Sequence, residues 1–338
     1  MSKKVLVTGA TGFLGSYLVR HLIKKGEQVR AIKRTSSKMD LVTEVQQAIE
    51  WYEGDILDLP FLEDAMEGIQ QVYHCAAMVS FDPRDIKQMM KVNVKGTANV
   101  VNAALFTGID KLLHVSSVAA IGRIKNQKPI TEKTKWQRSK YNSNYAISKF
   151  LAEQEVWRGQ AEGLNVVMIN PATVLGSGFW DQSTVRLFQQ VLDGLAFYPV
   201  GSTGYVDVRD VARMGVQLME ADISGQRFIA MAENRSYRDL FTEVAKVLNK
   251  RPPFIRVNLL IRHLAWRFEW LRSRLTNHRP IVTRETALQS ARDNVYRNDK
   301  SRQILDFDYI PISQTIQEVS QQLLLAQQNN GAPMYLPI

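Results

Sequence analysis

Short apolar runs alternate with longer amphipathic segments over residues 1–200 of the chain. The runs are rich in β-branched and aromatic residues, which is typical of strands buried on both faces of a parallel sheet. They lie at 4–7, 28–32, 49–52, 71–75, 111–115 and 165–169. The segments between them are long enough for crossover helices, as at 11–25, 84–106 and 141–161. This alternation predicts an α/β fold with a doubly wound parallel sheet.

The pattern changes after Pro171. Glycine and aromatic residues gather in 176–205, and short strands are expected at 206–208 and 227–230. From Ser236 onward the spacing of apolar residues is mainly helical. We therefore expect two units. A nucleotide-binding domain covers 1–175, with segments from about 203–232 returning to it, and a smaller, mostly helical, substrate-binding lobe covers 176–338.

Composition narrows the class of protein. The 338 residues are 45% hydrophobic and 22% charged, which is ordinary globular usage and excludes disordered, collagen-like and coiled-coil chains. The single cysteine, Cys75, excludes a disulfide framework and a cysteine-based zinc site, and it fits a reducing compartment. A strand-like run at 5–7 leaves no room for a secretory signal, and no apolar stretch reaches the ~18 residues of a spanning helix. We expect a cytoplasmic protein without a metal site.

The formal net charge of +10 is unevenly distributed, since residues 251–302 hold 12 Lys and Arg against four Asp and Glu. Within that segment, 259–275 has apolar residues at helical spacing with four arginines among them, and Trp266 and Trp270 form a second stripe. Two interpretations stay open: a helix in peripheral contact with a membrane surface, and a lobe helix that covers the substrate. The segment lacks a recognisable nucleic-acid motif, so no nucleic-acid partner is expected.

A glycine-rich turn follows the first predicted strand and opens the first predicted helix. Its first glycine permits a tight turn, its second lets backbone amides approach a pyrophosphate, and its third permits close helix–strand packing. Amides at a helix N-terminus then face the anionic phosphates. The turn therefore predicts a dinucleotide site that includes Gly9, Thr11, Gly12, Phe13, Leu14 and Gly15.

The end of the second predicted strand indicates which dinucleotide binds. An NAD site usually has Asp or Glu there for the ribose hydroxyls. This chain has Lys33 and Arg34, followed by two serines and Lys38. Cations and hydroxyls at this place suit a 2′-phosphate, so NADP(H) is favoured over NAD(H). The alternative is a solvated basic turn.

Tyr145 and Lys149 stand four residues apart, one turn apart on the same face of a predicted helix. A free tyrosine has a pKa of about 10, and a nearby ammonium favours the phenolate. Tyr145 is therefore a candidate acid/base for a substrate oxygen. Ser116 and Ser117 follow the fifth predicted strand, at the edge where strand ends face a ligand crevice. A serine hydroxyl there can hold a substrate carbonyl.

These motifs together resemble the extended short-chain dehydrogenase/reductase family, also described as the NAD(P)-dependent epimerase/dehydratase superfamily. The resemblance runs over nearly the whole chain. It includes the segments 8–15, 54–56, 74–77, 93–97, 115–122, 145–149, 170–176, 207–212 and 299–301. One departure is Asn170, which stands where the family pattern has Arg. The resemblance implies a Rossmann domain and further cofactor contacts from Asp55, Ile56, Ala76, Ala77, Ser116, Pro171, Thr173 and Val174.

The resemblance also implies catalytic roles. Tyr145 is the acid/base, Lys149 lowers its pKa and holds the nicotinamide ribose, Ser117 orients the substrate oxygen, and Asn93 supports a water or lysine relay. The pattern is most similar to the dihydroflavonol-reductase and 3β-hydroxysteroid-dehydrogenase-like branches, which interconvert alcohols and ketones. A nucleotide-sugar epimerase is the alternative, and a non-catalytic dinucleotide sensor is a minor one. A homodimer through the helices that hold Asn93 and Tyr145 is expected by analogy.

Apolar and aromatic residues are expected to line the substrate site, and they favour a hydrophobic carbonyl compound. The candidates are Met78, Val79, Phe81, Phe179, Trp180, Phe197 and Tyr198. Several of them could instead pack the interface with the lobe. Arg186, Arg209 or Arg213 could equally bind a diphosphate, which would favour a nucleotide sugar.

Overall fold

Seven parallel strands form the central sheet in a computed structural model that describes residues 2–122, 129–139, 141–182, 184–276, 278–280 and 282–338. The strands are β1 (Lys4–Thr8), β2 (Gln28–Lys33), β3 (Ile49–Glu53), β4 (Gln71–His74), β5 (Lys111–Val115), β6 (Val166–Pro171) and β10 (Gln226–Ala230). Their order across the sheet is β10-β6-β5-β4-β1-β2-β3. The predicted doubly wound parallel sheet is confirmed, with its change of direction between β1 and β4.

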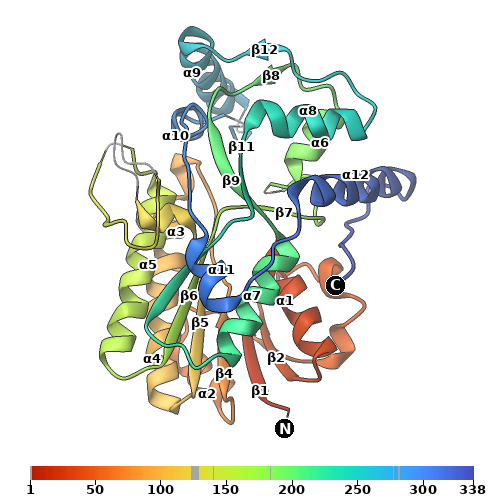
Figure 1. Cartoon of the computed structure of the whole chain (residues 1–338). Coiled ribbons are helices and arrows are strands. Elements are labelled where there is room, and N and C mark those ends of the chain that lie inside the picture. The colour runs from red at the N-terminus through yellow and green to blue at the C-terminus, as the bar shows by residue number, and fades with distance from the viewer. Residues whose placement is uncertain (1, 123–128, 140, 183, 277, 281) are drawn as a thin grey trace.

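Helices cover both faces of this sheet (Figure 1). One face carries α1 (Phe13–Lys24) and α7 (Val208–Glu220), and the other carries α2 (Leu59–Met66), α4 (Gly96–Thr107) and α5 (Asn144–Ala161). The helix predicted at 84–106 is divided into α3 (Ile86–Met90), a π-helical turn (Lys91–Lys95) and α4. Short 3-10 helices span Asp40–Val42, Gln46–Ala48, Pro83–Asp85 and Val118–Ile121.

The C-terminal lobe lies over the carboxyl ends of the strands, in the upper half of Figure 1. It has a three-stranded sheet of β11 (Glu233–Ser236), β9 (Ser202–Asp207) and β7 (Thr173–Leu175), and a two-stranded sheet of β12 (Ile255–Arg256) and β8 (Phe197–Tyr198). Its helices are α6 (Arg186–Leu192), α8 (Tyr237–Val247), α9 (Leu259–Thr276), α10 (Arg284–Gln289) and α12 (Ile312–Gln328), while α11 (Asp299–Leu305) packs beside β10.

The strand expected at 206–208 is present as the end of β9, which stops at Asp207 before α7 begins at Val208. The strand β9 pairs with β7 and β11 in the lobe, whereas β10 returns to the central sheet beside β6. No helix among the described residues is both long and apolar enough to cross a bilayer.

Candidate active site

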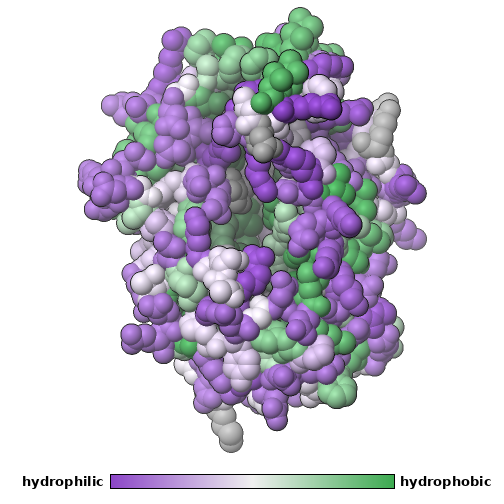
Figure 2. All heavy atoms as spheres, turned by 180° about the vertical axis from the view of Figure 1, so that it is seen from behind, coloured by the Kyte–Doolittle hydropathy of each residue, from purple (hydrophilic) through white to green (hydrophobic). Residues whose placement is uncertain are grey.

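The carboxyl ends of the parallel strands border a cavity of about 850 Å³ that residues of the lobe complete on the other side. Figure 2 shows a hollow between the two halves of the molecule. Ser117 lines the cavity, and so do all the predicted cofactor residues except Lys38. These are Gly9, Thr11, Gly12, Phe13, Leu14, Gly15, Lys33, Arg34, Asp55, Ile56, Ala76, Ala77, Ser116, Tyr145, Lys149, Pro171, Thr173 and Val174.

The glycine turn leaves backbone groups exposed to the cavity. Gly9 has a φ of +71°, and a Cβ there would lie 2.7 Å from the Ala76 backbone nitrogen. A Cβ on Gly15 would lie 2.1 Å from the Gly9 carbonyl oxygen. The helix α1 begins after Gly12 without a side-chain cap, so its first amides keep their donors for an anion. This cradle fits a pyrophosphate.

The cations of the basic turn after β2 differ in their surroundings. The Lys33 ammonium lies 2.6 Å from a Glu53 carboxylate oxygen, so Lys33 is already neutralised by an acid on β3. Arg34 instead lines both the main cavity and a neighbouring pocket of about 250 Å³. Lys38 also lines that neighbouring pocket, and its ammonium lies 5.2 Å from the Phe179 ring centroid. Of the three predicted cations, Arg34 and Lys38 are therefore placed for a further phosphate.

Tyr145, Ser117 and Lys149 all line the cavity, and the Tyr145 and Ser117 side chains are hydrogen-bonded to each other. Ser143 caps α5 by accepting a hydrogen bond from the Ala146 amide at 3.1 Å, which sets Tyr145 in the first turn. Burial raises the pKa of Tyr145 above its ordinary value, and a hydrogen bond with the Ser117 side chain counteracts this. One turn later, Lys149 is 2% exposed and donates to the Val115 carbonyl at 2.9 Å. Burial lowers the pKa of Lys149 to about 8.

Asn93 does not line the cavity, but it hydrogen-bonds to Met78, which does. Its amide nitrogen donates to the Met78 carbonyl and to the Ser148 hydroxyl, each at 2.9 Å, and its oxygen accepts from the Met78 amide at 2.7 Å. These bonds tie the segment after β4 to α5. Because all the donors of this side chain are engaged, Asn93 is a positioning residue in this arrangement, and the predicted relay role remains a prediction.

Two buried histidines, His74 and His114, lie near Lys149, and sequence analysis assigned no role to them. The His74 ring contacts the Thr8 and Thr97 hydroxyls at 2.8 and 2.9 Å, and its centroid lies 5.2 Å from that of His114. Burial, and then the Lys149 ammonium, lower the pKa of His74 to about 3 and that of His114 well below its ordinary value. Both rings are therefore neutral and add no charge beneath the site.

A buried network that sequence analysis missed extends from α5 to β10. Glu153 is fully buried, accepts from the Asn170 amide at 2.5 Å, and forms an ion pair with Arg227 at 3.0 Å. The Asn170 amide also donates to the Ser117 carbonyl at 2.9 Å. Glu153 stands four residues after Lys149, as Lys149 does after Tyr145. This repeated spacing places Glu153 on the same helix face, and it is the signal from which the residue could have been predicted. The network holds the Ser117 loop against the catalytic helix.

The substrate half of the cavity is only partly as predicted. Met78, Val79 and Phe81 line it, and the Phe81 ring lies edge-on to Tyr145 with 5.8 Å between centroids. The lobe contributes residues that sequence analysis did not identify, namely Thr184, Thr203, Tyr237, Gln289 and Asn294. These are separated from the catalytic residues by long stretches of chain, and the local pattern gave no signal for them.

Four of the predicted apolar residues are outside the main cavity, which corrects the expectation for them. Phe179 lines the pocket beside Lys38, and Trp180 is buried and donates from its indole nitrogen to the Ala332 carbonyl at 3.1 Å. Phe197 and Tyr198 form β8, which pairs with β12.

The arginines considered for a diphosphate are also elsewhere. Arg209 binds Asp207 at 2.8 Å, Arg213 binds Asp210 at 2.8 Å, and Arg186 is an exposed residue at the start of α6. Among the described residues that line the cavity, the cations are Lys33, Arg34 and Lys149. None of these belongs to the lobe.

Comparison with known proteins gives concordant results. The family model for the NAD-dependent epimerase/dehydratase family matches residues 5–230. A putative dihydroflavonol 4-reductase of Synechocystis sp. is 31% identical over 328 residues, which cover 94% of this chain and 93% of that one. Sterol demethylase protein B of Methylococcus capsulatus is 35% identical over 236 residues, covering 68% and 70% of the two chains.

Solved structures extend the likeness to the whole fold. The crystal structure of gox2253 has a TM-score of 0.82 and 28% identity, and the match covers 98% of this chain and 99% of that one. A UDP-glucose 4-epimerase of Thermotoga maritima, solved with UDP-glucose, has a TM-score of 0.78 at 19% identity, over 96% and 99% of the chains. At that level of identity the second likeness concerns the fold alone.

Proposed function

Because the chain belongs to the NAD-dependent epimerase/dehydratase family, we propose that it is an NADP(H)-dependent oxidoreductase that interconverts a secondary alcohol and a ketone. Its curated relatives include reductases, namely the putative dihydroflavonol 4-reductase and a cinnamoyl-CoA reductase of Petunia hybrida that is 31% identical over 73% of this chain. The observation that carries the proposal is that Tyr145, Ser117 and Lys149 line one cavity whose described lobe residues include no cation.

The three residues divide the chemistry between them. In the direction of reduction, Tyr145 donates its phenolic proton to the substrate carbonyl oxygen, and the Ser117 hydroxyl donates a hydrogen bond to the same oxygen. The Lys149 ammonium stabilises the phenolate that remains, and it would also hold the ribose of a bound cofactor. When bound, a nicotinamide cofactor would supply or accept the hydride. In the direction of oxidation the Tyr145 phenolate accepts the proton.

The proposed cofactor contacts come from the glycine turn after β1, from Ser116 and from the basic turn after β2. The glycine turn and the uncapped N-terminus of α1 would hold the pyrophosphate. The Ser116 hydroxyl is buried, lines the cavity and has no hydrogen-bond partner among the described residues, which suits a contact with the cofactor. Arg34 and Lys38 would bind a 2′-phosphate, with Ser37 beside them in the same small pocket. This arrangement supports a preference for NADP(H).

The lining of the substrate half supports an uncharged and largely apolar substrate. Val79 and Phe81 present apolar surface, while Tyr237, Gln289 and Asn294 offer neutral hydrogen-bonding groups. A nucleotide sugar carries a diphosphate, for which a site normally provides cationic side chains. The described part of the lobe offers none at the cavity, so a ketone or secondary alcohol is favoured over the substrate of an epimerase.

The test is a substrate panel of hydrophobic ketones, hydroxysteroids and nucleotide sugars, in which NADPH absorbance and product stereochemistry are both followed. Stoichiometric consumption of NADPH with a hydrophobic ketone is expected. Inversion of a nucleotide sugar with no net change in the cofactor would establish the epimerase alternative instead. Tight NADPH binding without turnover of any class would favour the dinucleotide sensor.

We also propose that the protein is a cytoplasmic homodimer. The α4 and α5 helices would form the interface, as in the resemblance described above. Phe106, near the end of α4, is 75% exposed, and Trp157 on α5 is only partly buried, so this side of the sheet offers apolar surface for a second copy. Sedimentation equilibrium tests the dimer, and replacement of Phe106 by Gln is expected to weaken it.

A further inference from the structure

An apolar stripe runs along the outer surface of α9. At about 100° per residue, Leu260, Leu264, Phe268, Leu271 and Leu275 fall on one face of the helix. Their side chains are between 49% and 77% exposed, and no residue of α9 is buried. Figure 2 shows hydrophobic side chains gathered at the top of the molecule, the end at which Figure 1 places α9. The stripe therefore faces solvent and does not cover the cavity.

Arginines border the stripe on both sides. On the same helical projection, Arg267 and Arg274 lie along one edge and Arg272 along the other. Arg272 is paired with Glu269 at 2.9 Å. Arg267 and Arg274 are exposed, and neither lies within ion-pair distance of a carboxylate in the part of the chain that the structure describes. An exposed apolar face with cationic borders is complementary to a surface that is apolar beneath and anionic outside.

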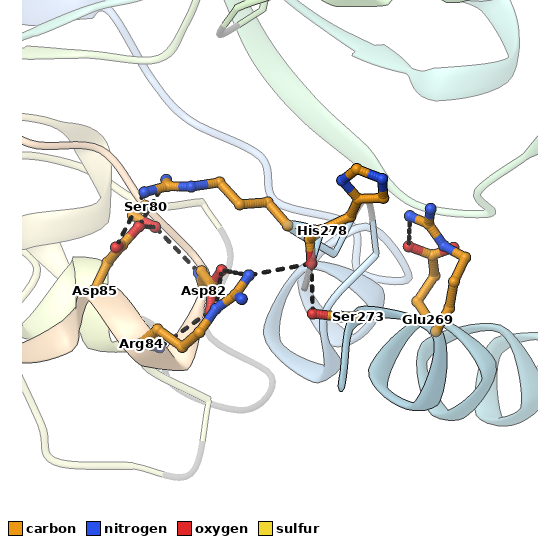
Figure 3. Close-up of polar contacts among 9 residues, drawn as sticks. Ser80, Asp82, Arg84, Asp85, Glu269, Ser273 and His278 are labelled. Atoms are coloured by element: carbon orange, nitrogen blue, oxygen red, sulfur yellow. Dashed lines mark hydrogen bonds and ion pairs between the residues drawn. The ribbon is translucent and has the colours of Figure 1, made fainter. Parts of the chain in front are cut away.

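The opposite face of α9 is joined by polar contacts to the segment after β4 (Figure 3). Ser273 falls on the side opposite the stripe, and its hydroxyl donates to the His278 carbonyl at 2.7 Å. Arg84, in the segment after β4, donates to the same carbonyl at 3.2 Å. Arg279 forms an ion pair with Asp85 at 3.0 Å.

The segment reached by these contacts belongs to the cavity wall. The stretch between β4 and α3 carries Val79 and Phe81, which line the substrate half. Within this stretch, the Ser80 hydroxyl donates to Asp85 at 2.7 Å. This bond connects Asp85, which pairs with Arg279, to the residue between Val79 and Phe81. The stripe thus faces solvent, while the helix that carries it is linked to a segment of the cavity wall.

We propose that α9 is a docking surface for an anionic lipid bilayer. The stripe enters the boundary between headgroups and acyl chains, and Arg267 and Arg274 contact the lipid phosphates. Docking would place the bilayer against the helix that is linked to the cavity-lining segment of Val79 and Phe81. The inference goes beyond the proposed reaction, because docking needs no turnover.

Charge decides against a second copy of the chain as the occupant. The helix carries Arg262, Arg267, Arg272 and Arg274 against the single acid Glu269. Two such helices packed stripe to stripe would bring like charges together along both borders. An anionic bilayer reverses this, because its surface potential attracts each of the same arginines.

The test is co-sedimentation of the full chain with vesicles of phosphatidylcholine mixed with phosphatidylglycerol, and with vesicles of phosphatidylcholine alone. The wild type is expected to sediment mainly with the anionic vesicles and to be released by salt. The double variant Leu264→Gln/Phe268→Gln is expected to bind at least about tenfold more weakly. Arg267→Gln/Arg274→Gln should lose about fivefold for each arginine removed.

The matched control is Leu324→Gln/Leu325→Gln, which removes two exposed leucines from α12, where they are 40% and 45% exposed. This control should sediment as the wild type does. All four proteins are compared by circular dichroism and thermal unfolding, because the replaced residues are exposed and the fold should be retained. A wild type that stays in the supernatant with both kinds of vesicle would overturn the proposal. A wild type that binds no vesicle and forms a dimer that the stripe variant dissociates would do the same, and would assign the stripe to self-association.

Discussion

Glu153, fully buried on α5, and Arg227, partly buried on the outermost strand of the central sheet, form an ion pair with 3.0 Å between carboxylate and guanidinium. The family pattern would place an arginine at residue 170, where this chain has Asn. Arg227 therefore supplies from β10 the positive charge that β6 lacks, and the Asn170 amide completes the bonds of Glu153. The pair stands one turn from Lys149, so its effect reaches the active site.

Glu153 and Arg227 should contribute to stability as a coupled pair. Arg227→Met leaves the buried Glu153 carboxylate without a cation, and we expect the free energy of unfolding to fall by about 3–5 kcal/mol. Glu153→Gln removes the carboxylate that neutralises the Arg227 guanidinium. The double variant should lose less than the sum of the two single variants, which urea denaturation of all four proteins would measure. Strictly additive losses would contradict the coupling.

Lys149 should make stability depend on alkaline pH. Burial lowers its folded pKa to about 8, below the usual value of 10.5, so the unfolded chain binds more protons between these values. The charged form therefore destabilises the fold below pH 8, and this cost is lost as the pH rises to about 10.5. Relative to Lys149→Met, the wild type should gain about 3 kcal/mol across that window. Equal pH profiles of the two proteins in denaturant titrations would refute this.

Replacing the proton donor should stop turnover without disturbing the cofactor site. Tyr145→Phe removes the phenolic hydroxyl and keeps the ring that packs against Phe81. We expect kcat to fall by roughly 100-fold to 10,000-fold, with the Kd for NADPH nearly unchanged. Ser117→Ala should show a smaller loss, because the phenol still donates its proton. Turnover retained in Tyr145→Phe would remove this residue from the mechanism.

The basic residues after β2 should differ in their effect on cofactor choice. Arg34→Gln and Lys38→Gln each remove a cation from the small pocket, and each should weaken NADPH binding by about tenfold or more while leaving NADH binding unchanged. Lys33→Gln is the matched control, because Lys33 is already paired with Glu53. Its effect on the Kd should be several times smaller. An equal loss in all three variants would argue against the assigned phosphate pocket.

Added bulk at the third glycine of the turn should reshape the phosphate cradle. A Cβ on Gly15 meets the Gly9 carbonyl oxygen at 2.1 Å, so Gly15→Ala must displace the loop. Overpacking of this kind costs about 1–3 kcal/mol, and we expect NADPH affinity to fall at least tenfold. Gly68→Ala is the control, since that position has a φ of +69° and nothing within 4 Å of a Cβ. It should lose some stability and keep its NADPH affinity, as isothermal titration would record.

Much of the cofactor half could be predicted from the sequence because its determinants are local. The six predicted strands are all present, and β5 has the bounds that were expected for it. The glycine turn follows β1 directly, and Tyr145 and Lys149 share a helix face by their spacing alone. The substrate half was predicted only in part: Phe81 lines the cavity, whereas Phe197 forms a strand of the lobe and Trp180 packs in the core.

The sequence by itself determined the doubly wound sheet, the glycine turn after β1 and the shared helix face of Tyr145 and Lys149, since strand periodicity, glycine turns and helical spacing act over a few residues. Only the tertiary structure decided that Arg227 pairs with Glu153, that Lys33 is neutralised by Glu53, and that Tyr237 reaches the cavity. It also decided that the apolar stripe of α9 faces outward. Each of these depends on how segments far apart in the chain pack together, and local pattern carries no information about that packing.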